Sequence, residues 1–243
     1  MDRFRSGRPI VGVAAWLLAG CGGGGDARAT TDSAPATAAP ATAATLPAPA
    51  GRPAIVFLGT SLTAGYGLDP DSAYPALLQR KLDSAGLDFE VVNAGVSGQT
   101  SAGTLRQLDW ILRSPPAYLV IETGANDMLR GQDTDSLRAN LQVMIDRVKA
   151  RAPATQVLLC AMEAMPNLGQ RYVREFRAVY TGLAQANGLP LLPFLLDRVA
   201  GIDSLNQGDG IHPNEAGSRL VADNLWRALA PLLRARPASG PPD

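Results

Sequence analysis

Short apolar runs alternate with longer stretches of helical period between residues 53 and 236. The runs have the length of strands and read as apolar throughout, as expected for strands covered on both faces; they occupy 54–58, 89–92, 118–121, 156–160 and 191–194. The helical stretches occupy 74–85, 101–112, 135–151, 170–186 and 213–233. This repeat predicts right-handed crossovers and parallel strands. We therefore expect one α/β domain at 53–236, a three-layer α/β/α sandwich with a central five-stranded parallel sheet.

The first twenty residues have the organisation of a secretory signal peptide. Three arginines precede an apolar run from Ile10 to Leu18, and small residues follow. The run covers roughly half of a ~30 Å hydrocarbon core, so a permanent spanning helix is not expected. Its end, Leu-Ala-Gly-Cys at 18–21, resembles a bacterial lipobox, in which the cysteine is lipidated and becomes the new N-terminus. An ordinary signal peptide with an incidental Cys21 is the alternative.

Residues 21–52 continue as a glycine tract followed by Ala, Thr and Pro. They hold too few large apolar side chains to offset their ordering entropy, which predicts a disordered tether after Cys21. A short disordered tail is expected at 237–243. The lipobox resemblance implies a membrane partner through the lipid anchor, at the bacterial cell envelope. Gly22, where an aspartate favours inner-membrane retention, indicates the periplasmic face of the outer membrane.

Charge and cysteine usage exclude several classes of function. Lys+Arg and Asp+Glu both number 22, and no basic stripe argues for a nucleic-acid partner. Two cysteines and one histidine are too few soft ligands for a zinc site, so we expect no metal and no cofactor. Cys160, in an apolar run, is expected to be a small buried hydrophobe rather than a reactive thiol. We expect a monomer.

His212, the only histidine, follows Asp209 by three residues and Ser61 by about 150. A serine nucleophile needs an imidazole base, and the imidazole needs a carboxylate that fixes its tautomer. Polar, glycine-rich turns follow the first three strands, and the carboxyl ends of parallel strands meet at one edge of the sheet. The loop before the last helix can bring Asp209 and His212 to that edge. The order of residues thus predicts a serine hydrolase.

Four blocks carry a resemblance to a known family. They are Gly-Thr-Ser-Leu-Thr-Ala-Gly-Tyr-Gly at 59–67, Val-Asn-Ala-Gly-Val-Ser-Gly-Gln-Thr at 92–100, Gly-Ala-Asn-Asp at 124–127 and Asp-Gly-Ile-His-Pro-Asn at 209–214. In this order and spacing the chain resembles the SGNH hydrolase (GDSL esterase) family, over about 54–235, and within it the bacterial thioesterase, lysophospholipase and arylesterase branch. The resemblance implies a flavodoxin-like sheet, with Ser61 as nucleophile, His212 as base and Asp209 as acid. It also implies an oxyanion hole made by the Ser61 N–H, the Gly98 N–H and the Asn126 side-chain amide.

Each of these residues also has a structural interpretation when taken alone. Ser61 fits a helix N-cap, the His-Pro pair fits a loop, and Asn126 fits an Asx turn. The chain departs from the family at Thr60, where an aspartate is usual. The threonine hydroxyl can make some of the hydrogen bonds that the aspartate would make to neighbouring loop groups, but without a charge. We expect Asp127, Glu122 and Arg130 to anchor loops rather than to take part in catalysis.

The leading hypothesis is a lipid-anchored serine esterase that hydrolyses small-molecule acyl esters through an acyl-enzyme intermediate. The family resemblance implies short to medium acyl esters, with thioesters and lysophospholipids as further candidates. Met128-Leu129 and residues 162–166 either line an acyl groove or belong to the core. An envelope polysaccharide O-deacetylase is the alternative enzyme, disfavoured by the few aromatic residues. A catalytically inactive envelope binding module is the alternative outside enzymes, and the complete set of catalytic residue types argues against it.

Overall fold

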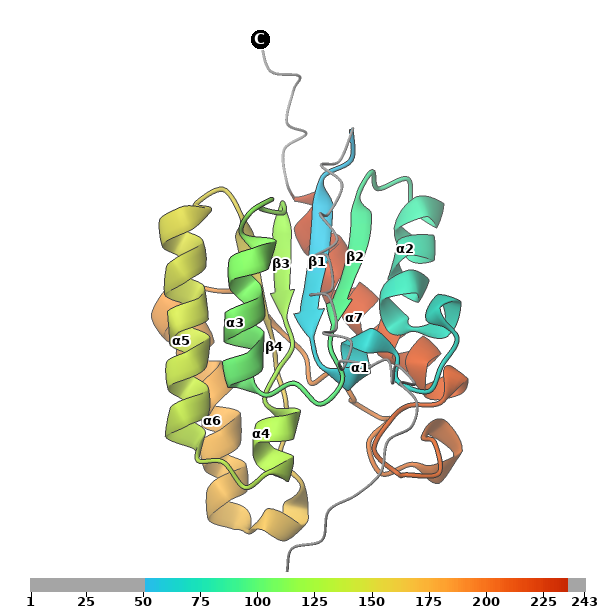
Figure 1. Cartoon of the computed structure of the whole chain (residues 1–243). Coiled ribbons are helices and arrows are strands. Elements are labelled where there is room, and N and C mark those ends of the chain that lie inside the picture. Colours follow the sequence, from blue (N-terminus) through green and yellow to red (C-terminus); the bar gives the residue numbers. More distant parts are fainter. Residues whose placement is uncertain (1–50, 236–243) are drawn as a thin grey trace, which may run out of the picture. The chain divides into compact units, whose positions relative to one another are not determined.

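A central five-stranded parallel sheet organises the computed structural model, which describes residues 51–235 (Figure 1). Its strands are β1 (Ala54–Gly59), β2 (Glu90–Gly95), β3 (Tyr118–Ile121), β4 (Gln156–Cys160) and β5 (Leu191–Leu192), in the spatial order β2-β1-β3-β4-β5. The predicted three-layer α/β/α fold is confirmed. Four expectations lie outside the described residues: the signal peptide, the lipidation of Cys21, the tether as far as residue 50 and the tail at 237–243.

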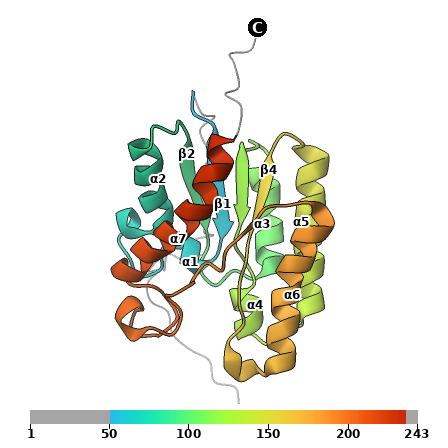
Figure 2. The ribbon, with the colours of Figure 1, turned by 180° about the vertical axis from the view of Figure 1, so that it is seen from behind.

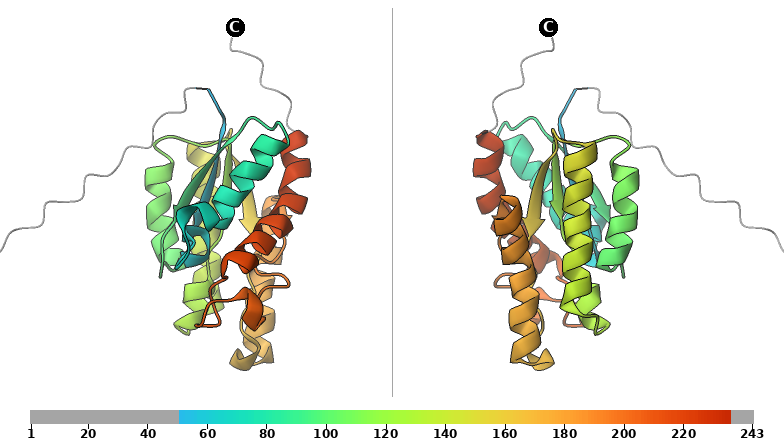
Figure 3. Two further views of the ribbon diagram at one scale, coloured as in Figure 1. Left: turned by 90° about the vertical axis from the view of Figure 1, so that its right-hand side faces the viewer. Right: turned by 90° about the vertical axis from the view of Figure 1, so that its left-hand side faces the viewer.

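Helices cover both faces of the sheet. One face carries α2 (Tyr74–Ser84) and α7 (Glu215–Arg234), which pack against each other (Figure 2). The other carries α3 (Ser101–Ile111) and α5 (Thr134–Arg151), and α6 (Gln170–Asn187) packs beside α5 and contacts β4 and β5 (Figure 3). All five long helices begin and end within two residues of their predicted bounds. No helix within 51–235 has the length and apolar character needed to cross a membrane.

Two expectations about the strands are wrong. β2 is an edge strand, and its Glu90 and Asn93 are exposed, so it is not apolar on both faces. β5 ends at Leu192 rather than at residue 194. Pro193 follows and has no N–H to donate to a neighbouring strand, so the ladder stops there. The three central strands β1, β3 and β4 are almost wholly buried, as the sequence predicts.

The loops that carry the chemistry meet at the carboxyl edge of the sheet. Gly59 at the end of β1 pairs in register with Gly95 at the end of β2, so the segments that follow start side by side. Two short helices, α1 (Ser61–Ala64) and α4 (Ala125–Leu129), stand at this edge where the sequence indicated only turns (Figure 1). A Cβ on Gly59 would lie 2.0 Å from Thr63 Oγ1, so the close packing of α1 onto the strand end requires glycine.

Candidate active site

Ser61 is the first residue of α1 and follows β1 with one residue between them. Thr60 caps the helix: its backbone is extended and its hydroxyl accepts a hydrogen bond from the Leu62 N–H at 3.4 Å. Gly65, in the left-handed region, ends the helix after a single turn. The N-cap is therefore Thr60 and not Ser61, and the Ser61 hydroxyl is left available to other partners.

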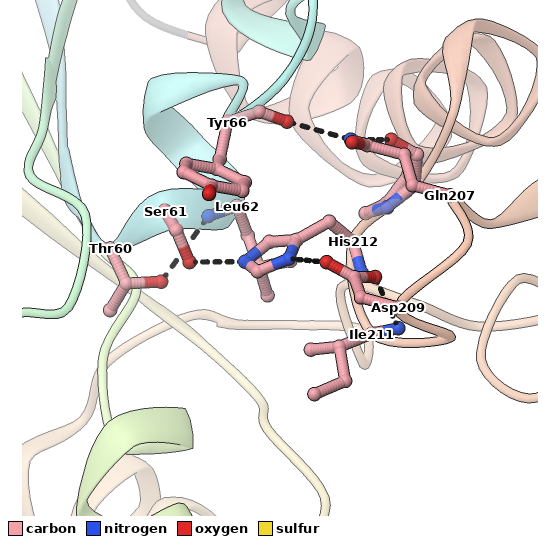
Figure 4. A network of polar contacts seen from close by, with 9 residues as sticks. Thr60, Ser61, Leu62, Tyr66, Gln207, Asp209, Ile211 and His212 are labelled. Carbon is pink, nitrogen blue, oxygen red and sulfur yellow. Dashed lines mark hydrogen bonds and ion pairs between the residues drawn. The ribbon is translucent and has the colours of Figure 1, made fainter.

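The loop before α7 presents His212 to Ser61. His212 Nε2 lies 2.9 Å from Ser61 Oγ, and His212 Nδ1 lies 2.6 Å from Asp209 Oδ2 (Figure 4). The second oxygen, Asp209 Oδ1, accepts the N–H groups of Ile211 and His212 at 2.9 and 3.0 Å. The structure thus brings together the three side chains that the sequence predicts as nucleophile, base and acid, across 151 residues of chain between Ser61 and His212.

These hydrogen bonds fix the charge of the carboxylate. The backbone N–H of His212, then its imidazole, then the N–H of Ile211 lower the pKa of Asp209 to about 2. Asp209 is therefore ionised at any pH near neutrality and accepts the proton on Nδ1. In the neutral imidazole with its proton on Nδ1, Nε2 has its lone pair directed at the Ser61 hydroxyl, and this is the tautomer that a general base requires.

Gly98 and Asn126 line the same cavity as Ser61 and His212. Asn126, on α4, donates one amide hydrogen to the Gln99 carbonyl at 3.0 Å, and Arg130 donates to the Gly98 carbonyl at 2.8 Å. Gly98 has a φ of +76°, a conformation that favours glycine. The second and third sequence blocks are thus tied to each other beside the serine, and one hydrogen of the Asn126 amide remains for a ligand.

Glu122 lies buried beneath the serine loop and is 1% exposed. It accepts the Thr60 N–H at 2.8 Å, the Thr60 hydroxyl at 3.0 Å and the Thr63 hydroxyl at 2.7 Å. Burial raises the pKa of this carboxyl, and the hydrogen bonds from Thr60 and Thr63 oppose the rise. Thr60, which stands where the family usually has an aspartate, is therefore a hydrogen-bond donor to Glu122, the residue that follows β3. Through these bonds Glu122 anchors the serine loop.

Two further residues join the loops of the site to one another. Asp127 accepts the N–H and the hydroxyl of Ser101 at 2.8 and 2.5 Å, which joins α4 to the start of α3. Arg130 holds the Gly98 turn from the end of α4, as described above. The contacts of Asp127, like those of Glu122 and Arg130, agree with the expected loop-anchoring role.

A cavity of about 570 Å³ opens beside Ser61 and His212. Its walls are mainly apolar: Leu62, Met128, Leu129, Met162, Ala164, Met165, Phe194, Leu196 and Ile211. Met128 and Met162 are almost fully buried and also face the cavity, so they belong both to the core and to the groove. The two readings of these methionines that the sequence left open are therefore compatible.

Two contacts of the site were not predicted from the sequence. The Tyr66 ring lies against the His212 imidazole, with centroids 4.7 Å apart, and Gln207 hydrogen-bonds to the backbone on both sides of the Ser61–His212 pair (Figure 4). Their only signal in the sequence is that they stand near catalytic candidates: Tyr66 is the last residue but one of the first block, and Gln207 stands two residues before Asp209. Such neighbours become visible as site residues only once the loops are placed in space.

The remaining candidate chemistry in the described part of the chain is limited. No group of three or more His, Cys, Asp and Glu side chains within residues 51–235 is placed to hold a metal ion. Cys160 is fully buried, and burial raises the pKa of its thiol, which confirms the expected small buried hydrophobe.

Comparison with known proteins identifies the family. Residues 57–220 match the GDSL-like lipase/acylhydrolase family. Esterase TesA of Pseudomonas aeruginosa is 42% identical over 180 residues, which are 74% of this chain and 89% of that protein. Thioesterase 1/protease 1/lysophospholipase L1 of Escherichia coli is 37% identical over 180 residues, which are 74% of this chain and 84% of that protein. The crystal structure of the psychrotrophic esterase EstA from Pseudoalteromonas sp., inhibited by monoethylphosphonate, aligns with a TM-score of 0.71 at 33% identity, over 75% of this chain and 99% of that one. The chain therefore belongs to the GDSL-like lipase/acylhydrolase family and is an enzyme that acts on ester bonds.

Proposed function

We propose that the chain is a serine esterase for acyl esters of short to medium length, with Ser61 as nucleophile, His212 as general base and Asp209 as the acid that orients it. The observation that carries the proposal is the hydrogen-bonded series from Asp209 through His212 to Ser61, at 2.6 and 2.9 Å, beside an apolar cavity. Each group is within the reach that proton transfer needs.

In the proposed reaction, Ser61 Oγ attacks the ester carbonyl while His212 Nε2 takes its proton. The imidazolium that forms is stabilised by ionised Asp209. His212 then gives the proton to the leaving alcohol, and an acyl-Ser61 ester remains. A water molecule, activated by the same imidazole, attacks that ester, releases the acid and restores the Ser61 hydroxyl.

Charge develops on the carbonyl oxygen in both steps, and we assign its stabilisation to three donors: the Ser61 N–H, the Gly98 N–H and the free hydrogen of the Asn126 amide. Preorganised donors are effective because they need no reorientation as charge forms. The bonds from Asn126 to the Gln99 carbonyl and from Arg130 to the Gly98 carbonyl support this assignment, since they hold the donors in place before substrate binds.

The shape and polarity of the cavity favour an acyl chain over an acetyl group. A cavity of about 570 Å³ lies in the size range of small-molecule sites, and an acetyl group would leave most of its apolar wall in contact with water. The names of the relatives, esterase and thioesterase/lysophospholipase, support the same class. Thioesters and lysophospholipids present the same acyl carbonyl and are included in the proposal.

A series of p-nitrophenyl esters from acetate to dodecanoate tests this assignment. Each added methylene that enters the cavity contributes about 0.8 kcal/mol, so kcat/KM is expected to rise about fourfold per methylene until the cavity is filled. Lysophosphatidylcholine, an acyl-coenzyme A and acetylated xylan complete the series. A maximum at acetate, together with turnover of acetylated xylan, would support the polysaccharide O-deacetylase instead.

We further propose that the enzyme is anchored by lipid on Cys21 and acts at the bacterial cell envelope, at the periplasmic face of the outer membrane. The sequence features described above support this: the short apolar run, the lipobox-like residues 18–21 and the Gly/Ala/Pro/Thr segment before β1. From its composition, this segment is expected to span roughly 30 Å root-mean-square, which would let the folded domain stand clear of the lipid head groups.

A further inference from the structure

We propose that Gln207 is a positioning residue: its carboxamide joins the segment that carries Ser61 to the loop that carries His212. The proposal rests on the proposed roles of Ser61 and His212. The Ser61 segment and the His212 loop are distant in sequence. Proton transfer between Ser61 and His212 therefore depends on how the backbones of these two segments are placed relative to each other.

The carboxamide uses both of its hydrogens across this junction. Gln207 Nε2 donates to the Tyr66 carbonyl at 2.7 Å (Figure 4) and also to the Pro213 carbonyl at 3.0 Å. The first carbonyl belongs to the second residue after α1, and the second carbonyl belongs to the residue that follows His212. One side chain thus connects the end of the nucleophile helix to the backbone next to the base.

The backbone of Gln207 is itself part of the His212 loop. Its N–H donates to the His212 carbonyl at 2.7 Å, and its carbonyl accepts the Gly210 N–H at 2.9 Å. Asn206 and Pro213 form an antiparallel bridge beside it. Because both ends of this turn are hydrogen-bonded, a displacement of the Gln207 side chain is transmitted to His212.

The carboxamide also fits closely against Gly67. A Cβ on Gly67 would lie 2.2 Å from Gln207 Oε1, so a side chain at this position would displace the amide. Gly67 has a φ of +75°, which favours glycine at this position. The Tyr66 backbone, fixed in this way, keeps the Tyr66 ring against the His212 imidazole.

The hydrogen bonds at this position require glutamine rather than another side chain of similar size and shape. Two carbonyl oxygens must each receive a hydrogen, and a neutral primary amide supplies two from one nitrogen. Glutamate of the same shape would set a carboxylate oxygen against both carbonyls, and methionine would supply no donor. A shift of about 1 Å between nucleophile and base is enough to cost about 10²-fold in rate.

Steady-state kinetics of the full chain with p-nitrophenyl butyrate tests the proposal. Gln207→Glu is expected to lower kcat about 10²-fold and Gln207→Met about tenfold, with KM within twofold of wild type, because the cavity is unchanged. Gln79 is the matched control: it is half-buried and donates to the Phe89 carbonyl at 3.1 Å between α2 and β2, far along the sheet from the site. Gln79→Glu and Gln79→Met are expected to keep kcat within twofold of wild type.

A second measurement separates positioning from a general loss of structure. In the His212→Ala background, Gln207→Met is expected to change the residual rate less than twofold, since the group it positions is gone. Folded Gln207 variants with kcat within threefold of wild type would overturn the proposal, and so would an equal fractional loss in the His212→Ala background. Wild-type turnover by Ser61→Ala or His212→Ala would overturn the proposed function itself, which is a different result.

Discussion

The carboxylate beneath the serine loop offers a quantitative test of how that loop is held. In Glu122→Ala, the Thr60 N–H, the Thr60 hydroxyl and the Thr63 hydroxyl lose their acceptor. The Thr63 hydroxyl and Tyr74 OH, 2.7 Å apart, are then left with a single hydrogen bond between them, so one of their two hydrogens also lacks an acceptor. Together with the two donors of Thr60, three buried donors remain unpaired. At about 1 to 3 kcal/mol for each unpaired buried group, the free energy of unfolding is expected to fall by about 3 to 9 kcal/mol.

Glu122→Gln is expected to cost far less, about 1 kcal/mol or less near neutral pH. The amide oxygen can accept from the Thr60 N–H and the Thr63 hydroxyl, and its NH₂ can donate to Thr60 Oγ1.

The effect of Glu122 on the free energy of unfolding depends on pH with a definite sign. Burial raises the pKa of Glu122 above 4.5, so the ionised carboxyl destabilises the folded state increasingly as pH rises through that higher pKa. Glutamine has no such penalty, so the cost of Glu122→Gln is expected to shrink as pH rises.

Urea unfolding at several pH values measures these effects, with Glu175→Ala as the control because Glu175 is exposed on α6. The control is expected to leave the unfolding midpoint nearly unchanged. A Glu122→Ala protein within about 1 kcal/mol of wild type would refute the anchoring role, because the unpaired donors would then carry no penalty. A cost of Glu122→Gln that grows with pH would refute the sign of the pKa shift.

Three further outcomes follow from the site and the N-terminal sequence. Asn126→Ala is expected to lower kcat by roughly 10² to 10³ with KM nearly unchanged, as for loss of one oxyanion donor; turnover of the folded variant within threefold of wild type would remove Asn126 from the hole. Asp209, with a pKa of about 2, is expected to stay ionised throughout the pH range of the assay, so its protonation adds no loss of log kcat/KM on acidification. A slope of two in log kcat/KM against pH would contradict this. Cys21→Ser is expected to release the protein from the membrane fraction or leave an uncleaved precursor, and unchanged fractionation would refute lipidation at Cys21.

Periodicity was sufficient to predict most of the fold. The strands 118–121 and 156–160 coincide with β3 and β4, because central strands are buried along almost their whole length and are correspondingly apolar, and because their flanking helices have a clear period. The order of strands in the sheet is not contained in that pattern. The strand order makes β2 an edge strand, with Glu90 and Asn93 exposed. The two-residue length of β5 depends on Pro193.

The residues of the site were predictable to different extents for physical reasons. Ser61, Asp209 and His212 belong to short blocks whose spacing is itself the signal, and the structure places them within hydrogen-bond distance of one another. Tyr66 and Gln207 act through contacts with a loop far away in sequence, and nothing in their local pattern distinguishes them from ordinary loop residues. Their partners are set by how two loops pack, which only the folded chain determines.

Covalent labelling of the nucleophile tests the central claim most directly. An alkyl fluorophosphonate reacts with a serine that a neighbouring base activates, and mass spectrometry of the digested protein locates the adduct. One adduct per chain is expected, on Ser61; it is expected to be absent in Ser61→Ala and to form at least about 10²-fold more slowly in His212→Ala. An adduct on another residue, or labelling of Ser61 at the wild-type rate in His212→Ala, would contradict the claim that Ser61 is a nucleophile activated by His212.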